Sequence, residues 1–387
     1  MEKWCFFGFG KIIGGNIDNG FDLSIESEND VKTIKAKRVV IATGSSPKLI
    51  PNFNIDHQRI LTSSDILHPN FKIVPKKLVI IGAGVIGCEF ANIFATFGSK
   101  VTVLEYLPLP IATEEPMIIR EIMNKFEKMG IELLISQNVL SIEKTETGVK
   151  VTTCPANIPK EEIENAEKKV FEGDYCLISV GREKEISNIG LEQLDIKLSR
   201  GSIYVTPETL ETNIEGIYAI GDVTGGLMLA HVASYEGDVA VANALSSIGG
   251  FKIKPMKPDY SVVPATIFTS PNIGSVGLRR ADAKDKNISI TLGRFTYAAL
   301  GKAKCMGEEE GFIMFLANKE DGKIIGASCI GAEAPELIAE IALGMKFGLS
   351  AHDIASVIHS HPTISEMVLE GAEDVFGMAI HRKGRPR

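Results

Sequence analysis

The sequence lacks any apolar run long enough to cross a lipid bilayer, and its opening residues do not follow the pattern of a signal peptide. It also lacks an excess of positive charge, since 49 acidic residues against 41 lysines and arginines give a formal net charge of −8. These absences predict a cytoplasmic protein, and they argue against a membrane or a nucleic acid as its partner.

Closely spaced cysteines are missing as well. The chain has six cysteines, but they are scattered, with neither a C-x-x-C nor a C-x4-C pair among them. This spacing excludes a dedicated zinc cluster and a closely spaced redox pair. His359 and His361 have no cysteine or acidic ligand immediately beside them, so we expect no metal site.

The most informative stretch, residues 78–105, reads LVIIGAGVIGCEFANIFATFGSKVTVLE. Four apolar residues lead directly into a G-x-G-x-x-G motif. The apolar spacing that follows predicts a helix with Gly98 as its left-handed cap, and a second strand begins at Lys100. Strand, tight turn, helix and strand in this order are typical of a dinucleotide-binding unit.

Each glycine of the motif has its own physical task. Gly82 allows the sharp turn, Gly84 lets the backbone approach a pyrophosphate, and Gly87 lets the helix lie close to the strand. The start of the helix then offers free N–H groups and the positive end of its dipole to phosphates. The alternative is a tight strand–helix turn without a ligand, but the acid that ends the next strand, Glu105, favours a nucleotide site.

Glu105 also distinguishes between two cofactors. A carboxylate at this position accepts hydrogen bonds from both ribose hydroxyls and repels a 2′-phosphate. The segment that follows it, YLPLPIAT, contains no lysine or arginine. The sequence therefore favours NAD over NADP.

The chain of 387 residues is too long for one ordinary core and predicts two or three domains. Residues 70–184 alternate strands and helices, which predicts one α/β domain around the glycine motif. From residue 256 on, strands rich in β-branched residues follow one another without helices between them, and two helices close the chain. This second pattern predicts an antiparallel sheet in a separate α+β domain.

The second helix of the α/β domain has recognisable signals at both ends. Thr113 can cap its N-terminus, Glu114 and Glu115 suit the positive first turn, and Gly130 follows its buried stripe.

Asp222 stands at the carboxyl end of a buried strand, GIYAIGD at residues 216–222. Ligands of open α/β sheets bind at such strand ends. Aspartate is also a common turn former. From the spacing alone, both a ligand-binding role and a turn role for Asp222 stay open.

The segment HSHPTISE, residues 359–366, allows two interpretations. Pro362 prevents a helix from running through His361, and Thr363 with Glu366 forms the capping-box pattern of a following helix. Glu366 is therefore either only part of a helix cap, or the partner that orients the His361 imidazole and raises its basicity for general acid–base work.

Taken together, seven segments resemble one family, the pyridine nucleotide-disulfide oxidoreductases, and most closely its members that oxidise a dihydrolipoyl dithiol with NAD+. Members that reduce glutathione share the His-Pro-Thr turn, but they typically use NADPH and carry basic residues where this chain has Glu105. The segments are GFGKI (8–12), ATGSSP (42–47), GAGVIGCE (82–89), SVGR (179–182), AIGDVTGGLMLAH (219–231), TSPNIGSVGL (269–278) and HSHPTISE (359–366).

The resemblance implies an α/β fold of Rossmann-like dinucleotide-binding domains, with an incomplete FAD-type domain interrupted by an NAD-type domain, and a C-terminal α+β dimerisation domain. The FAD-type part would comprise residues 1–69 and 185–255. The NAD-type domain would comprise residues 70–184, and the dimerisation domain residues 256–387.

The same resemblance implies FAD and NAD as cofactors and assigns residues to each. The implied FAD contacts are Gly10, Gly44, Asp222 and Ala230. The implied NAD contacts are Gly82, Gly84, Gly87, Glu105, Val139 and Gly181.

The resemblance further implies a reaction. Electrons would pass from a protein-bound dihydrolipoyl dithiol to a protein disulfide, through FAD, to NAD+. His361 would deprotonate the dithiol with Glu366 as its partner, and it would serve the disulfide of the other subunit of a homodimer. The implied partner is the lipoyl domain of a 2-oxo acid dehydrogenase or glycine cleavage complex.

One part of the family pattern does not occur in these 387 residues: a first G-x-G-x-x-G unit for FAD, followed shortly by a C-x4-C pair. We expect the downstream part of a longer enzyme, a fragment completed by a second chain, or a non-redox NAD-binding module. Another disulfide reductase of the same family is a further alternative. We also expect the strands that end in ATG and in GDV to lack sheet neighbours.

Overall fold

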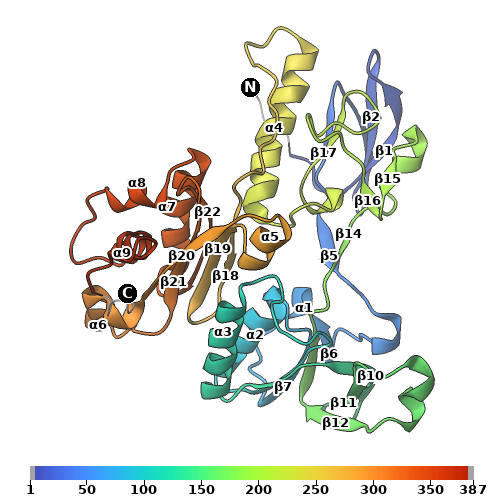
Figure 1. Ribbon diagram of the computed structural model, residues 1–387. Coiled ribbons are helices and arrows are strands. Elements are labelled where there is room, and N and C mark those ends of the chain that lie inside the picture. The colour runs from blue at the N-terminus through green and yellow to red at the C-terminus, as the bar shows by residue number, and fades with distance from the viewer. Residues whose placement is uncertain (1–4, 382–387) are drawn as a thin grey trace. The chain divides into compact units, whose positions relative to one another are not determined.

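The computed structural model describes residues 5–381. Residues 1–4, which enter the signal-peptide argument, and residues 382–387 lie outside the described part. The chain forms two compact units, one of residues 1–46 and 182–260 and the other of residues 47–181 and 261–387 (Figure 1). Each unit is described by itself.

The first unit begins with a three-stranded antiparallel sheet of β1 (Phe9–Asn16), β2 (Gly20–Glu26) and β3 (Val31–Ala36). The Asn16 side chain accepts the N–H groups of two turn residues between β1 and β2, as asparagine does in such turns. Phe21 is completely buried and belongs to the core of this unit.

A short parallel pair of strands follows, β4 (Val39–Ile41) and β17 (Ile217–Ala219). These are the ATG and GDV strands. They pair with each other, so the expectation that both lack a sheet neighbour is wrong. The long helix α4 (Ala230–Ile248) packs on the pair through Tyr218, because Ala240 and Ala244 present small side chains to it.

The remaining elements of the first unit are short. They are β5 (Ser45–Pro47), which pairs with β14 (Arg182–Lys184), the hairpin β15 (Leu198–Ser199) and β16 (Ser202–Ile203), and the 3-10 turns Leu191–Leu194 and Gly221–Thr224.

The second unit contains a five-stranded parallel sheet in the order β6-β13-β7-β8-β9. Its strands are β6 (Ile60–Thr62), β7 (Lys77–Ile81), β8 (Lys100–Leu104), β9 (Glu132–Leu134) and β13 (Tyr175–Ile178), and its helices are α1 (Ser63–Leu67), α2 (Val85–Thr96) and α3 (Pro116–Lys128). This is the α/β unit that the glycine motif predicts, and Gly98 has the expected left-handed φ of 92°. An antiparallel sheet of β10 (Gln137–Lys144), β11 (Val149–Pro155) and β12 (Lys169–Gly173), with a 3-10 turn at Lys160–Asn165, is inserted before β13.

The C-terminal part of this unit is a five-stranded antiparallel sheet in the order β18-β19-β22-β21-β20. The strands are β18 (Pro264–Ile267), β19 (Asn272–Gly277), β20 (Ile290–Thr296), β21 (Phe312–Asn318) and β22 (Ile324–Gly331). The helices are α5 (Arg280–Asp285), α6 (Gly301–Met306), α7 (Ala334–Lys346), α8 (Ala351–Ala355) and α9 (Glu366–Asp374). The predicted sheet is confirmed, but the prediction of no helices between its strands is wrong, because the short helices α5 and α6 lie there.

The parallel sheet and the antiparallel sheet share one hydrophobic core. Ile122 and Phe126 of α3 belong to the same buried cluster as Phe312 and Met314 of β21. The two sheets therefore form one compact unit, and the separate domains 70–184 and 256–387 stay a prediction. Across residues 5–381, no helix is both long and apolar enough to cross a membrane.

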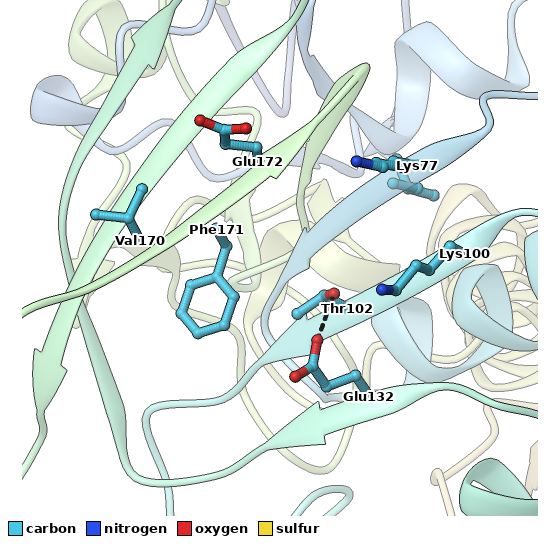
Figure 2. A pocket seen from close by; sticks show the side chains of 8 residues that line it. Lys77, Lys100, Thr102, Glu132, Val170, Phe171 and Glu172 are labelled. Carbon is cyan, nitrogen blue, oxygen red and sulfur yellow. Dashed lines mark hydrogen bonds between the residues drawn. The ribbon is translucent and has the colours of Figure 1, made fainter.

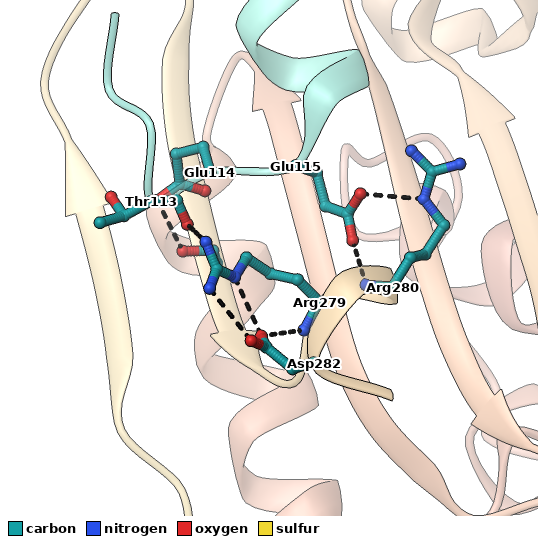
Figure 3. Close-up of polar contacts among 7 residues, drawn as sticks. Thr113, Glu114, Glu115, Arg279, Arg280 and Asp282 are labelled. Carbon is teal, nitrogen blue, oxygen red and sulfur yellow. Dashed lines mark hydrogen bonds and ion pairs between the residues drawn. The ribbon is translucent and has the colours of Figure 1, made fainter. Parts of the chain in front are cut away.

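The predicted start of α3 is wrong. Thr113 does not cap the helix, which has Glu115 at its N-cap and Pro116 at its first position. Proline fixes the backbone for a first helical residue, so it sets the start of the helix. The carboxylate of Glu115 instead binds Arg280, which is drawn in Figure 3.

Helix α9 lies on β20, and two glycines make this contact possible. A Cβ atom on Gly293 of β20 would lie 2.3 Å from the carbonyl oxygen of Gly371 in α9. The Asp374 carboxylate accepts the N–H of Arg294 at 2.8 Å, which fixes the far end of the same helix. Because α9 begins at Glu366, this packing positions a candidate functional residue.

We expect Gly293→Ala to destabilise the protein by about 1–3 kcal/mol, because the new methyl group must displace α9. Gly301→Ala is the matched control, since nothing lies within 4 Å of a Cβ atom there. Thermal unfolding of both variants measures the difference. Equal melting temperatures would show that α9 does not depend on the close approach at Gly293.

Candidate functional site

The turn between β7 and α2 has no room for side chains at two of its three glycines. Gly82 has a φ of 98°, and a Cβ atom on it would lie 2.6 Å from the Ser179 carbonyl oxygen. A Cβ atom on Gly87 would lie 1.9 Å from the carbonyl oxygen of Gly82. Gly84, the N-cap of α2, has open space around its Cα, and no side chain caps the helix there. The N–H groups at the start of α2 are therefore not used by a capping side chain, which leaves them available to a phosphate.

The side chain of Glu105 is hydrogen-bonded to this turn. One carboxylate oxygen accepts the N–H of Ala83 at 2.5 Å, and the other accepts the N–H of Leu107 at 2.7 Å. The residue is 8% exposed. Since each carboxylate oxygen has a second lone pair, Glu105 retains the capacity to accept two hydroxyl groups of a ribose.

The two other residues assigned to NAD lie at different places in the second unit. Gly181 follows β13 with a φ of 116°, and nothing lies within 4 Å of a Cβ atom on it. Val139 lies half-buried on β10, beside a register shift between Val139 and Ser141. The structure thus joins the glycine turn to Glu105 directly, whereas Val139 belongs to the inserted antiparallel sheet.

Asp222 belongs to a polar cluster in the first unit. Its carboxylate accepts a short hydrogen bond from the Ser45 hydroxyl and lies 3.8 Å from Arg182 Nε. Arg182 also donates to the Ser45 hydroxyl at 2.7 Å and to the Ser45 carbonyl oxygen at 2.5 Å. Gly44 precedes Ser45 with a φ of 74° and open space around its Cα. The structure therefore brings Gly44 and Asp222 together.

Glu236 of α4 is hydrogen-bonded to the turn that carries Asp222. This buried carboxylate accepts the N–H of Gly221 at 2.6 Å and the hydroxyl of Tyr260 at 2.7 Å. Burial and the neighbouring Glu236 raise the pKa of Tyr260, so the hydroxyl stays a donor. Glu236 fixes the backbone next to Asp222 and leaves the Asp222 carboxylate partly exposed.

The other two residues assigned to FAD are less closely tied to this cluster. Ala230 is the first residue of α4 and is exposed. Gly10 lies on β1, opposite Ile25 of β2, in the separate antiparallel sheet.

His361 and Glu366 form the pair that the sharper interpretation predicts. The Nδ1 atom of His361 lies 2.9 Å from one oxygen of Glu366, and the other oxygen accepts the N–H of Thr363 at 2.9 Å. Burial would raise the pKa of Glu366, but the hydrogen bonds from Thr363 and His361 lower it below its ordinary value. The imidazole side chain is 77% exposed, so Nε2 faces solvent. Glu366 is the first residue of α9, and the N-cap is Ser365 without a side-chain cap hydrogen bond, so the prediction of Thr363 as the cap of this helix is wrong.

His359 has a different environment from His361. Its side chain is only 4% exposed, and its Nε2 lies 3.0 Å from Glu340 of α7. His359 and His361 thus have separate carboxylate partners. Over residues 5–381, no three side chains among His, Cys, Asp and Glu are grouped to hold a metal ion.

Sequence reasoning missed several residues of these clusters. Ser45 and Arg182 stand inside quoted motifs, and their position next to Gly44 and Gly181 is a signal for them. Glu236 and Tyr260 give no such signal, because the hydrogen bonds that join them to Gly221 and to each other connect distant parts of the sequence.

A cavity of about 440 Å³ lies at the amino ends of the parallel strands (Figure 2). The glycine turn follows the carboxyl end of β7, so the cavity is at the opposite edge of the sheet. Two lysines and two glutamates offset each other in its lining, and Glu132 is bound by the Thr102 hydroxyl at 2.9 Å. The cavity is therefore not part of the dinucleotide turn. Its lining consists of Lys77, Leu78, Lys100, Thr102, Glu132, Val170, Phe171 and Glu172.

The glycine turn generates a test with two variants. We expect Gly87→Ala to lower the free energy of unfolding by about 1–3 kcal/mol, and the melting temperature with it, because the new methyl group would collide with the carbonyl oxygen of Gly82. We expect Gly84→Ala to keep the melting temperature and to weaken dinucleotide binding, because its methyl group occupies only the open space. Thermal unfolding and NADH titration measure the two effects. If Gly87→Ala unfolds like the unchanged protein, the proposed close approach of α2 to β7 does not hold.

Comparison with known proteins supplies a family for this arrangement. Residues 13–237 match the family model described as pyridine nucleotide-disulphide oxidoreductase, and residues 263–372 match its dimerisation domain. Dihydrolipoyl dehydrogenase of Staphylococcus aureus is 37% identical over 365 residues, which are 94% of this chain and 74% of that protein. Dihydrolipoyl dehydrogenase of Geobacillus stearothermophilus is 38% identical over 353 residues, 91% of this chain and 71% of that protein.

Solved structures agree with this result. The HOCl-induced flavoprotein disulfide reductase RclA from Escherichia coli matches with a TM-score of 0.82 and 26% identity, over 95% of this chain and 78% of that one. LpdA from Mycobacterium tuberculosis matches with a TM-score of 0.82 and 26% identity, over 95% of this chain and 76% of that one. The expected α/β fold with a dimerisation domain is confirmed, and the chain belongs to the pyridine nucleotide-disulphide oxidoreductase family.

Proposed function

We propose that this chain works in a flavoprotein oxidoreductase of the dihydrolipoyl dehydrogenase type, which passes electrons from a protein-bound dihydrolipoyl dithiol through FAD to NAD+. The family match and the identity to dihydrolipoyl dehydrogenases support an enzyme with these two cofactors. The observation that carries the proposal is the geometry of His361 and Glu366.

In this proposal, His361 accepts the proton of the dithiol at Nε2. Its Nδ1 bond to Glu366 fixes the imidazole and leaves Nε2 as the acceptor of the neutral ring. Glu366 is held ionised by Thr363 and stabilises the positive charge that the ring gains. The exposure of the ring leaves it accessible to a dithiol carried by another protein.

The residues around Asp222 fit FAD. One oxygen of Asp222 accepts the Ser45 hydroxyl, so the carboxylate retains lone pairs for hydroxyl groups of the cofactor. The open space at Gly44 leaves room for a part of FAD to lie against the backbone there. FAD supplies two-electron transfer between dithiol and nicotinamide when bound. In this proposal, Gly10 and Ala230 complete its contacts.

The residues around Glu105 fit NAD. The proposal places the pyrophosphate at the free N–H groups of α2 and the ribose at the Glu105 carboxylate. Val139 and Gly181 are proposed as further contacts, and the open space at Gly181 is compatible with a ligand.

The buried thiols of this chain do not offer a redox pair. Among the described residues, six free cysteines are present, and burial raises the pKa of the Cys88 and Cys329 thiols to about 12. A thiol with so high a pKa is a poor nucleophile at neutral pH. The dithiol–disulfide step therefore needs a disulfide other than these buried residues.

The dimerisation domain supports a homodimer. We propose the lipoyl domain of a 2-oxo acid dehydrogenase or glycine cleavage complex as the second partner, and the cytoplasm as the location. The bacterial dihydrolipoyl dehydrogenases that the chain resembles support this assignment.

Substitution of His361 tests the proposed reaction in the FAD-containing holoenzyme. We expect His361→Gln to slow NAD+-dependent dihydrolipoamide oxidation by about 10²–10⁴-fold, because the proton acceptor is lost. Reduction of an artificial acceptor by NADH should be retained, since no thiol is deprotonated in that assay. His68→Gln, an exposed histidine outside the pair, is the control.

Two outcomes would contradict the proposal at different points. Equal losses in both assays would return His361 to a structural role. If the purified chain retains no flavin absorbance and binds no NADH, it does not have this redox function.

Glu105 tests the choice of cofactor. We expect Glu105→Gln to weaken NADH binding about 10-fold, because a charge-assisted hydrogen bond to the ribose is replaced by a neutral one. Binding of NADPH should improve relative to NADH, since the repulsion of the 2′-phosphate is removed. Fluorescence titration with both nucleotides measures the ratio, with Glu132→Gln on β9 as control. An unchanged ratio would refute the role of Glu105 in the choice of NAD.

A further inference from the structure

The segment between β8 and α3, residues 106–115, is bound to the glycine turn. The N–H of Ile111 donates to the carbonyl oxygen of Ala83 at 2.8 Å. Glu105 accepts the N–H of the same Ala83, so both backbone groups of this turn residue are occupied. The position of the turn therefore depends on where Ile111 is held.

Ile111 is held in a strained conformation. Its φ is 36°, and its side chain is only 4% exposed. A β-branched residue rarely adopts positive φ, and such a backbone costs about 1–3 kcal/mol, so it persists only where the surrounding structure imposes it. The N–H of Glu114 donates to the Ile111 carbonyl oxygen at 2.9 Å, so contacts that hold residues 113–115 also act on Ile111.

Two arginines at the junction of β19 and α5 supply such contacts (Figure 3). Arg279 donates to the carbonyl oxygen of Thr113 at 2.6 Å. Its guanidinium is fixed by Asp282, which accepts from Nε at 2.9 Å and from Nη2 at 3.1 Å. The hydrogen bonds from Arg279 lower the pKa of Asp282, which keeps this pair ionised.

Arg280 holds the end of the segment. Glu115, with a fully buried side chain, accepts the N–H of Arg280 at 2.5 Å and its Nε at 2.9 Å. The neighbouring Glu114 is also buried and accepts the Ser275 hydroxyl at 3.3 Å. A buried carboxylate requires a partner of this kind, so the end of the segment is tied to the C-terminal sheet.

We propose that Arg279 and Arg280 are positioning residues for dinucleotide binding. They hold residues 113–115, which keeps Ile111 in its strained conformation and Ala83 in the turn. They act from the C-terminal sheet on a nucleotide site that they do not touch. This inference rests on the proposed binding of NAD to the glycine turn.

Variants of the holoenzyme in which glutamine replaces one arginine test the inference. We expect Arg279→Gln to weaken NADH binding about 3- to 30-fold, as substitutions along a coupled network do. The Michaelis constant for NAD+ should rise while kcat and flavin content stay unchanged. Arg279→Gln removes the guanidinium from the Thr113 carbonyl oxygen and from the partly exposed Asp282, but Asp282 still accepts the backbone N–H of residue 279, so the protein should fold. Arg280→Gln should show a larger loss of affinity, and Arg280→Lys should restore part of it.

Lys125→Gln is the matched control. Lys125 of α3 binds Glu310 at 2.6 Å, which also joins the α/β part to the C-terminal part, but this ion pair does not involve residues 106–115. We expect its NADH affinity to equal that of the unchanged protein. An equal loss of affinity in Lys125→Gln and Arg279→Gln would show a general docking effect and overturn the inference.

Unchanged NADH affinity in Arg279→Gln and Arg280→Gln, with the unchanged protein binding NADH normally, would also overturn it. If the unchanged protein binds no NADH, the proposed function fails instead. The two failures are therefore distinguishable in one set of titrations.

Discussion

The close approach of α2 to the end of β7 is the constraint on which the nucleotide turn depends. With only 1.9 Å between a Cβ atom on Gly87 and the Gly82 carbonyl oxygen, the helix cannot carry a side chain there without moving. Ala83, between the two, has its N–H bound to Glu105 and its carbonyl oxygen bound to Ile111. The start of α2 is thus fixed by packing on one side and by hydrogen bonds on the other.

In the His361 pair, the Glu366 carboxylate makes two different contacts. Glu366 accepts the Thr363 N–H with one oxygen and binds the imidazole with the other. The predicted capping box is met only in the Thr363 contact, because the N-cap of α9 is Ser365. The packing of α9 on β20 at Gly293 determines where this carboxylate stands, so the geometry of the pair depends on a sheet outside the pair itself.

Local patterns predicted the parts of the fold that depend on local physics. The run from 78 to 105 correctly predicted β7, α2 and β8, because periodicity and glycine placement act within neighbouring residues. The start of α3 was mispredicted at Thr113 because Pro116 sets it and Glu115 binds Arg280 instead. Partners from distant segments leave no local pattern, so Arg280 could not be found from the sequence.

The electrostatics of the turn explain why its geometry matters so much. Residues 82–99 contain no lysine or arginine, and the whole chain carries a net charge of −8. A pyrophosphate bound there would be stabilised by backbone N–H groups and the helix dipole instead of by cationic side chains. Backbone donors cannot follow a ligand as a flexible lysine does, so their attraction falls off when the turn shifts. A turn of this kind needs rigid support, which the contacts of Arg279 and Arg280 with residues 113–115 are placed to give.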